Sequence, residues 1–296
     1  MSWQQPLQSF GELSQHESMA AHTTLAVGGM ATWYFKPHHK IALCQALSLI
    51  PDEIRILPLG RGSNLLVSDQ GFKGMVIDLG MLNHVEIKGR TLTAQAGSRM
   101  SKLAQTAAKA GLSGLEFMAT VPGDLGGGIA MNAGAFGQQA SDTCLQVDIV
   151  HRHGNEETLS KQQLNMVYRH SQIPDQAIIL AASFELLKGK AENILHAMRH
   201  MRQKRSQSQP LALPNCGSVF KNPEGDYAAR LIEAVGLKGK CMGDAQISNV
   251  HANFIVNHGS ASSDDIHALI ALVQHSVFEK FAIHLEPEVR ILESVQ

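Results

Sequence analysis

Apolar and polar residues alternate with strand-like spacing over much of the first 80 residues, and turns that contain glycine separate the apolar runs. The segments at 30–37, 54–59 and 74–80 predict strands, and IALCQALSLI at 41–50 predicts a helix. Strands interleaved with a helix in this way indicate an α+β module.

A second module begins near residue 84. Its predicted elements are a hairpin at 84–97 that turns at Gly89, a helix from Ser98 to Gly111, a hairpin around 147–159, a buried strand at 177–187 and a helix at 192–205. The polar, proline-containing segment SQSQPLALPN at 206–215 interrupts both the helical and the strand periodicity and is the best candidate for a linker.

A third module follows this linker. Its predicted elements are a helix at 227–237, a strand at 251–257, a helix at 264–281 capped by Ser262 or Ser263, and a strand at 285–292. The chain has no internal repeat or low-complexity tract, which argues against a solenoid or a disordered protein.

Composition narrows the functional class. The 296 residues carry 25 basic and 26 acidic side chains, so no electrostatic field for a nucleic acid or a membrane is expected. Four cysteines without paired spacing and fifteen histidines without an H-E-x-x-H pattern predict no disulfide scaffold and no metal. The N-terminus lacks the features of a signal peptide, so we expect a cytoplasmic protein. An oligomer is not required by any feature of the sequence.

The loop at Leu59–Leu65 (LGRGSNL) is the first candidate binding segment. Its glycines would expose backbone N–H groups that, with the Ser63 hydroxyl and the Asn64 amide, can surround a pyrophosphate. The loop lacks the G-K-[ST] of a Walker A motif and the third glycine of a dinucleotide fingerprint. A tight turn between strands is an equal alternative.

The second candidate segment, at 121–137, contains six glycines. Such density weakens regular structure by about 0.5–1 kcal/mol per glycine relative to alanine, so it usually marks close approach of the backbone to a bulky group. Apolar Ile129, Met131 and Phe136 lie between the glycines, unlike in a solvated linker. The segment predicts contact with a large planar ligand.

Five segments occur in the order found in UDP-N-acetylenolpyruvoylglucosamine reductases, a family that the chain therefore resembles. They are GRGSNLLVSD, GLSGLEFMATVPGDLGG with MNAGAFG, YRHS at 168–171, NCGSVFKNP at 215–223 and LEPEVRIL at 285–292. Together they extend over most of the chain, and five ordered segments are far more specific than either glycine-rich loop.

The resemblance implies an α+β protein with a p-cresol-methylhydroxylase-type FAD-binding fold. FAD-binding subdomain 1 would span 1–80, FAD-binding subdomain 2 would span 81–208, and an α+β substrate-binding domain would span 209–296, with its last strand able to return to the FAD site. The implied reaction is reduction of the enolpyruvyl group of UDP-N-acetylglucosamine enolpyruvate to UDP-N-acetylmuramate in peptidoglycan precursor synthesis. Hydride would pass from NADPH through FAD.

The same resemblance implies the catalytic residues. Arg169 and Glu288 would stabilise the enolate-like intermediate, and Ser218 would donate the proton. A guanidinium suits a carboxylate or enolate oxygen, and a serine hydroxyl can act as an acid only toward a strongly basic carbanion in a dry site. Glu286 would share the face of Glu288 in a strand, so the family pattern alone selects Glu288.

The binding residues are also expectations from the resemblance. The expected FAD contacts are Gly60, Arg61, Gly62, Ser63, Asn64, Leu65, Pro122, Gly123, Gly126, Gly127, Ile129, Asn132 and Gly134. The expected substrate contacts are Tyr168, Arg205, Lys221 and Asn222, and a solvated charged face is an equal alternative for the last three.

The chain departs from the family pattern in three places. Asp124 replaces the usual serine or threonine of the second loop, so its contact with FAD is in doubt, and Asp244 and Val250 replace a usual glycine and lysine. No tyrosine lies between Tyr168 and Ser218, which indicates the shorter, second class that lacks a tyrosine-bearing insertion.

Two alternative functions remain. An FAD-dependent oxidase of the same fold would carry similar glycine-rich loops but not the set of Arg169, Ser218 and Glu288. A non-catalytic nucleotide-binding regulator would have no need to keep these three residues. Re-oxidation of the reduced flavin by the enolpyruvyl nucleotide would separate the reductase from both.

Overall fold

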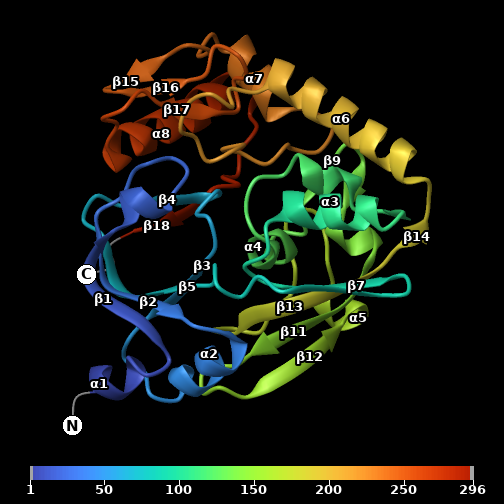
Figure 1. Ribbon diagram of the computed structural model, residues 1–296. Helices are drawn as coiled ribbons and strands as arrows, with labels where there is room; N and C mark the ends of the chain where they lie inside the picture. Colours follow the sequence, from blue (N-terminus) through green and yellow to red (C-terminus); the bar gives the residue numbers. More distant parts are fainter. Residues whose placement is uncertain (1–2, 294–296) are drawn as a thin grey trace. The chain divides into compact units, whose positions relative to one another are not determined.

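The computed structural model describes residues 3–293, and the chain divides into two compact units (Figure 1). Unit 1 consists of Met1–Gln15, Trp33–Gly60 and Gly74–Lys204, and unit 2 consists of His16–Thr32, Arg61–Lys73 and Arg205–Gln296. Each unit contains its own cluster of buried apolar side chains. The two clusters indicate two separate cores.

The elements of the two units differ in number and kind. Unit 1 contains α1 (Gln4–Leu7), α2 (Lys40–Leu47), β3 (Ile56–Leu59), β6 (Val85–Lys88), β7 (Thr91–Gln95), α3 (Met100–Lys109), β8 (Leu112–Ser113), η2 (Glu116–Ala119), α4 (Leu125–Ala130), β9 (Gly134–Ala135), β10 (Gln138–Gln139), η3 (Ala140–Asp142), β11 (Cys144–Val150), β12 (Glu156–Ser160), α5 (Lys161–Leu164), β13 (Ile178–Glu185) and β14 (Leu187–Lys188). Unit 2 contains η1 (Met19–His22), β4 (Leu65–Val67), α7 (Ala228–Ala234), β15 (Cys241–Met242), β16 (Ala245–Ile247), β17 (Ile255–Asn257), α8 (Ser263–Phe281) and β18 (Arg290–Leu292). The chain passes between the units within β1 (Gly11–Ser18), β2 (Met30–Pro37), β5 (Phe72–Asp78) and α6 (Ala191–Ser208), and in the loop after Gly60.

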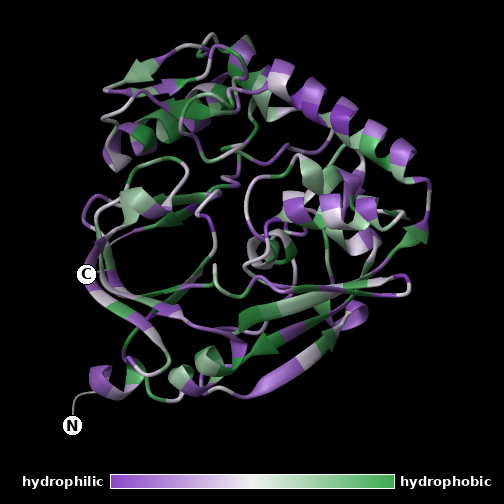
Figure 2. Ribbon diagram, viewed as in Figure 1, coloured by the Kyte–Doolittle hydropathy of each residue, from purple (hydrophilic) through white to green (hydrophobic). Residues whose placement is uncertain are grey.

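Unit 1 is built on a five-stranded antiparallel sheet in the order β12-β11-β13-β7-β6. The central strand β13 is buried at nearly every position and appears green in Figure 2, whereas the edge strand β12 is mostly exposed and largely purple. A central strand covered on both faces reads as a continuous apolar run, which is why its sequence predicted a buried strand.

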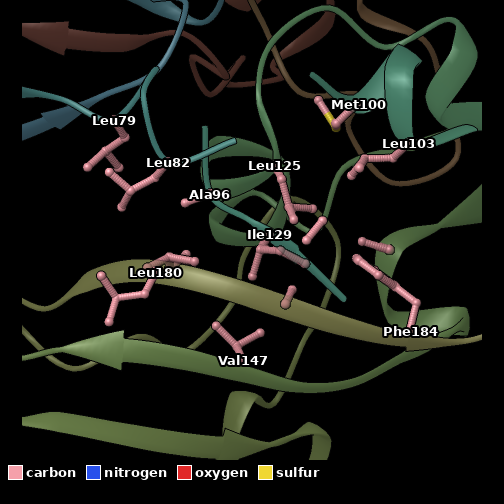
Figure 3. Close-up of a cluster of buried hydrophobic side chains, with 14 of the residues drawn as sticks. Leu79, Leu82, Ala96, Met100, Leu103, Leu125, Ile129, Val147, Leu180 and Phe184 are labelled. Carbon is pink, nitrogen blue, oxygen red and sulfur yellow. The ribbon is translucent and has the colours of Figure 1, made fainter. Parts of the chain in front are cut away.

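The glycine-rich segment contains a helix, α4, that the sequence did not predict. Its start is held by hydrogen bonds from Leu125 N to Ser98 O (2.9 Å) and from Gly126 N to Ala96 O (2.8 Å). Leu125 and Ile129, one helical turn apart, are fully buried and lie in the core with Leu180 of β13 (Figure 3). Tertiary packing therefore outweighs the low helix propensity of three consecutive glycines.

Most of the other predicted elements are confirmed. The hairpins at 84–97 and 147–159 are β6–β7 and β11–β12, and the helices at 192–205 and 227–237 correspond to α6 and α7. The helix predicted from Ser98 is α3, which begins after Arg99 and is followed by Gly111 in a left-handed conformation (φ +67°).

The structure decides which serine caps α8 in unit 2. Ser262 Oγ accepts a hydrogen bond from Asp265 N (3.0 Å), and Asp265 accepts one from Ser262 N, which together form a capping box. Such a cap contributes about 1 kcal/mol. Ser263 is bonded instead to Asp69, whose backbone N donates to the serine Oγ.

The last strand is shorter than the sequence predicted. Only Arg290–Leu292 forms a strand, β18, which pairs in parallel with β4 directly after the first glycine-containing loop. Residues 285–289 are irregular because Pro287, opposite Phe220 in an isolated bridge, has no N–H to extend a ladder. The strand thus lies beside β4, and its return to an FAD site stays a prediction.

The predicted boundary at 208/209 lies near Arg205, where the chain enters unit 2 for the last time. Residues 16–32 and 61–73 also belong to unit 2, although they fall in the predicted first module. The division of FAD binding between 1–80 and 81–208 stays a prediction.

Candidate functional site

The predicted site residues are divided between the two units. Gly60, the segment from Pro122 to Gly134 and the pair Tyr168–Arg169 belong to unit 1. Unit 2 contains Arg61, Gly62, Ser63, Asn64, Leu65, Arg205, Ser218, Lys221, Asn222 and Glu288.

The three consecutive glycines of α4 have different surroundings. A Cβ on Gly126 would lie 3.1 Å from the Ala96 Cβ, and one on Gly128 would lie 2.5 Å from the Met100 sulfur, so both glycines are closely packed and a side chain at either would have to displace a neighbour. Gly127 is exposed, and a Cβ there would meet nothing within 4 Å. Nothing in the described chain requires glycine at 127, and the exposed backbone there leaves space for a bound group.

The other residues of the second loop vary in exposure. Pro122 is exposed, whereas Ile129, expected to contact FAD, is fully buried, and its carbonyl oxygen accepts from Asn132 N and Ser171 Oγ. Gly134 is required by the β9–β10 hairpin, since a Cβ would lie 2.8 Å from Gln138 O. Gly123 adopts a left-handed backbone (φ +106°) that favours glycine.

Asp124 is buried and lies against the first loop. A Cβ on Gly60 would be 3.0 Å from Asp124 Oδ2, so the loops that carry these two residues meet at this point. Asp124 is the N-cap residue of α4, but its side chain makes no capping hydrogen bond. The carboxylate therefore occupies the space next to Gly60, where glycine is the residue that fits.

Arg169 lies in a tight turn held by two hydrogen bonds, from Val167 N to His170 O (2.9 Å) and from His170 N to Val167 O (3.2 Å). Its backbone is left-handed (φ +57°), a conformation that is uncommon for a residue other than glycine and that often occurs at functional sites. The guanidinium lies 5.1 Å from the ring centre of exposed Tyr168, and its Nη1 donates to Gly134 O at 3.5 Å. Arg169 therefore sits beside the glycine-rich segment.

In unit 2, the loop that follows Gly60 is bonded to the C-terminal segment. Asn64 Nδ2 donates to Glu288 O (3.0 Å), and Arg290 N donates to Asn64 O (3.0 Å). Gly62 is left-handed (φ +59°), and a Cβ on it would lie 2.2 Å from His22 O, so only glycine fits. Arg61 is exposed, Ser63 is half-buried and Leu65 is buried at the start of β4.

The segment that carries Ser218 is bonded to the segment that carries Glu288. Glu288 N donates to Val219 O (2.7 Å), so the residue after Ser218 is directly bonded to Glu288. Gly217, before the serine, is left-handed (φ +78°) with no atom within 4 Å of a Cβ position. Ser218 itself is half-buried.

A buried asparagine that the sequence analysis did not single out supports this segment. Asn253 Oδ1 accepts from Phe220 N (3.0 Å), its Nδ2 donates to Phe220 O (2.8 Å), and its backbone O accepts from Val219 N (2.9 Å). The one available indication was its polar amide within the apolar run predicted as a strand at 251–257.

The surroundings of Glu286 and Glu288 differ, although sequence physics could not separate the two residues. Glu286 is exposed and forms an ion pair with Lys221 (Nζ to Oε1, 2.5 Å). Glu288 is half-buried, and its charge, after burial itself, contributes to raising the pKa of the buried Cys216 thiol to about 12. Of the two glutamates, Glu288 is therefore the less exposed and the one whose charge acts on a buried group.

The remaining expected substrate contacts have partners within unit 2. Lys221 pairs with Glu286, as described, and Asn222 Oδ1 accepts from Ala228 N (3.1 Å) at the start of α7. Arg205 Nε donates to Gln209 Oε1 (2.5 Å), and burial lowers the pKa of Arg205 to about 10. Asp244 accepts from Ser260 N (3.0 Å), and Val250 is an exposed side chain.

Residues 3–293 contain no group of three or more His, Cys, Asp or Glu side chains arranged to hold a metal ion. No helix in this part of the chain is both long and apolar enough to span a membrane.

Two family models match the chain. The description "FAD binding domain" matches residues 31–160, and "UDP-N-acetylenolpyruvoylglucosamine reductase, C-terminal domain" matches residues 209–292. Proteins named UDP-N-acetylenolpyruvoylglucosamine reductase are similar over nearly the whole length. The one from Synechococcus sp. (strain JA-3-3Ab) is 44% identical over 96% of this chain and 92% of its own. The one from Magnetococcus marinus is 41% identical over 93% and 90%.

A solved structure is similar over the same length. The crystal structure of UDP-N-acetylenolpyruvylglucosamine reductase from Thermus caldophilus matches with a TM-score of 0.83 and 35% identity, covering 96% of this chain and 99% of that chain.

Proposed function

The chain belongs to the UDP-N-acetylenolpyruvoylglucosamine reductase family, and we propose which of its residues carry out the reaction of that family. It is an FAD-containing oxidoreductase with a p-cresol-methylhydroxylase-type FAD-binding fold. With NADPH as co-substrate, it reduces the enolpyruvyl group of UDP-N-acetylglucosamine enolpyruvate in peptidoglycan synthesis. The roles of individual residues are the proposed part.

The backbone of two segments would hold FAD. In unit 1 the candidates are Gly60 and the exposed face of α4 at Gly127, where the chain leaves space that a side chain would fill. In unit 2 they are the N–H groups and side chains of residues 61–65, in a loop held by Asn64 and the left-handed Gly62. Bound FAD supplies hydride transfer between NADPH and the substrate.

Arg169 would stabilise the negative charge that develops toward the substrate carboxylate as the enolpyruvyl double bond is reduced. Its guanidinium is always charged and presents two N–H groups in one plane, which matches two carboxylate or enolate oxygens. The left-handed turn at Arg169 supports this role, because the strained backbone is maintained by several hydrogen bonds to neighbouring segments. Tyr168, stacked under the guanidinium, would help to hold it in place.

Ser218 would donate the proton to the adjacent carbon of the intermediate, and Glu288 would orient or stabilise that intermediate. The observation that carries this assignment is the hydrogen bond from Glu288 N to Val219 O (2.7 Å). It brings together two motifs that lie 70 positions apart in the sequence. Lys221, whose ammonium is paired with exposed Glu286, would offer its charge to the phosphates of the nucleotide.

An anaerobic experiment tests this function. Purified protein should carry yellow FAD, NADPH should bleach it, and UDP-N-acetylglucosamine enolpyruvate should restore the yellow oxidised form with formation of UDP-N-acetylmuramate. Stopped-flow absorbance and product analysis would follow both steps. Rapid re-oxidation by oxygen without a response to the enolpyruvyl nucleotide would favour an oxidase, and colourless protein that takes up no flavin would favour a nucleotide-binding regulator.

Gly127→Ala tests the FAD contact without measuring turnover. Because the added methyl group meets no protein atom and alanine favours a helix by about 1 kcal/mol, the flavin-free protein should keep or slightly gain thermal stability. The affinity for FAD should fall by at least about tenfold, the equivalent of about 1.4 kcal/mol. Calorimetry of the flavin-free protein and titration with FAD would measure the two quantities.

Gly128→Ala is the matched control for the stability measurement, because it adds the same methyl group to the same helix at a position where that group does meet a protein atom. Its methyl group would have to displace the Met100 sulfur, so it should lower the stability of the flavin-free protein by about 1–3 kcal/mol. Wild-type affinity for FAD in Gly127→Ala would contradict the assignment of Gly127.

A cytoplasmic location and membership of the shorter class are further parts of the proposal. The four cysteines are free thiols, as is usual in reducing compartments. The absence of a tyrosine between Tyr168 and Ser218 supports the shorter class.

A further inference from the structure

Asn132 is the second residue after α4, directly after the C-cap residue Met131, and takes part in ending that helix. Its backbone is left-handed (φ +39°), its N–H donates to Ile129 O (3.0 Å), and the N–H of Ala133 donates to Gly128 O (2.7 Å). These two bonds form a Schellman motif, in which the left-handed position is most often glycine. Glycine would meet the backbone requirement at no steric cost, so the asparagine side chain needs its own explanation.

The side chain of Asn132 is almost fully buried, with 1% of its surface exposed, and its bonds all go to the chain. Its Nδ2 donates to Val167 O (3.0 Å) and to Gln139 Oε1 (3.1 Å). Its Oδ1 accepts from Ser141 N (3.0 Å). Both amide hydrogens are thus used within unit 1, and the FAD contact that the sequence analysis expected of Asn132 stays a prediction.

Val167 is the residue that closes the turn of Arg169. Its carbonyl oxygen accepts from His170 N across the turn and from Asn132 Nδ2, so the asparagine holds the base of the turn. Ser171, at the end of the turn, donates its N–H to Ala130 O (3.1 Å) and its hydroxyl to Ile129 O (2.5 Å). The turn is therefore attached to the last residues of α4 at two points.

We propose that Asn132 is a positioning residue that sets the placement of the Arg169 guanidinium through the Val167–His170 turn. The inference rests on the proposed function of Arg169 and adds a residue that acts through it. The same asparagine ends the glycine-rich helix and holds the arginine turn, so the position of the arginine is tied to the segment expected to contact FAD. A shift of about 1 Å at a catalytic group can lower a rate about 100-fold.

Asn132→Gly tests the inference because glycine preserves the left-handed backbone and removes only the side-chain bonds. Thermal stability should fall, because the buried Ser141 N–H loses its acceptor and the side chain leaves a void, so both half-reactions are measured at a temperature at which the variant stays folded. NADPH should still reduce the bound FAD within about threefold of the wild-type rate. Re-oxidation of the reduced flavin by UDP-N-acetylglucosamine enolpyruvate should slow by about 10- to 100-fold.

Asn165→Gly is the matched control. Asn165 lies four residues before Arg169, is exposed and has the same left-handed backbone (φ +38°) at the end of α5. The substitution should leave both half-reactions unchanged. Equal slowing of the two half-reactions in Asn132→Gly, or wild-type re-oxidation, would overturn the positioning role.

Asn132→Asp adds a signature that a purely structural residue would not give. The carboxyl group keeps the acceptor for Ser141 N, but it can donate to Val167 O only when protonated. The re-oxidation defect should therefore be largest at high pH and shrink as the pH falls, measured relative to wild type at each pH. A defect that does not vary with pH would contradict the hydrogen bond to Val167 as its cause.

A double-mutant cycle separates this inference from the function on which it rests. If Asn132 acts through Arg169, adding Asn132→Gly to Arg169→Lys should slow re-oxidation by less than about threefold further. Independent effects that multiply would refute the positioning role and leave the role of Arg169 intact. An Arg169→Lys variant with wild-type re-oxidation would refute the proposed role of the arginine itself.

Discussion

Ser218→Ala should leave the flavin fully reducible by NADPH and should slow its re-oxidation by the enolpyruvyl nucleotide by about 10²- to 10⁴-fold, or about 3–5 kcal/mol. The serine is expected to act only after hydride transfer, as the proton source, so the first half-reaction does not need it. The two rates would be measured separately by anaerobic stopped-flow absorbance of the flavin.

The segment that carries Ser218 is held by hydrogen bonds that do not involve the serine hydroxyl. These bonds join Glu288 N to Val219 O and Asn253 to Phe220, and Ser218 itself is half-buried. The variant should therefore keep its fold and its flavin. Ser260→Ala, an exposed serine of the same unit, is the control and should have wild-type rates. Unimpaired re-oxidation in Ser218→Ala would exclude the serine as proton donor.

Arg169→Lys should lower the rate of re-oxidation by about 10²- to 10³-fold, which is the usual cost of removing one preorganised group that stabilises charge in a transition state. Lysine keeps the positive charge and imposes the same left-handed backbone cost. It lacks the planar pair of N–H groups, so the loss of rate measures the contribution of the planar guanidinium geometry and not of the charge alone. Single-turnover kinetics with reduced enzyme would measure it.

The effect should lie in the turnover step and not in folding. Arg90→Lys is the matched control in the same unit, because Arg90 forms an exposed ion pair with Glu185 (2.7 Å) that contributes at most about 1 kcal/mol. Arg90→Lys should leave both half-reactions unchanged. If Arg169→Lys weakened substrate binding with no change in the maximal rate, Arg169 would bind the carboxylate equally well before and during the reaction.

Local patterns predicted several elements correctly. The amphipathic α3, the hairpin that turns at Gly89 and the buried strand β13 each carry their own periodicity or turn residue. Helix α4 could not be predicted in this way, because its glycines oppose a helix and only the burial of Leu125 and Ile129 favours one. The strand expected at 285–292 was too long for a related reason, since Pro287 interrupts pairing that the apolar pattern alone favoured.

The candidate site also divides into features that the sequence predicted and features that only the structure showed. Motif order identified the family, the flavin and the residue types needed for charge stabilisation and proton transfer, because these depend on local sequence. The structure alone decided that Glu286 is paired with Lys221 while Glu288 lies near buried Cys216. It also gave Asn132 and Asn253 their bonds to the chain, which the sequence could not indicate for an isolated asparagine.

The sequence by itself determined the family of this protein, through two glycine-rich loops and the motifs that carry Arg169, Ser218 and Glu288 in their order. Only the tertiary structure decided which atoms meet. Asn132 and Val167 are 35 positions apart, and Asn64 and Glu288 are 224 positions apart. Periodicity and spacing report on neighbours along the chain, whereas these hydrogen bonds depend on how distant segments pack. The residues that hold the candidate catalytic groups therefore emerged only from the folded chain.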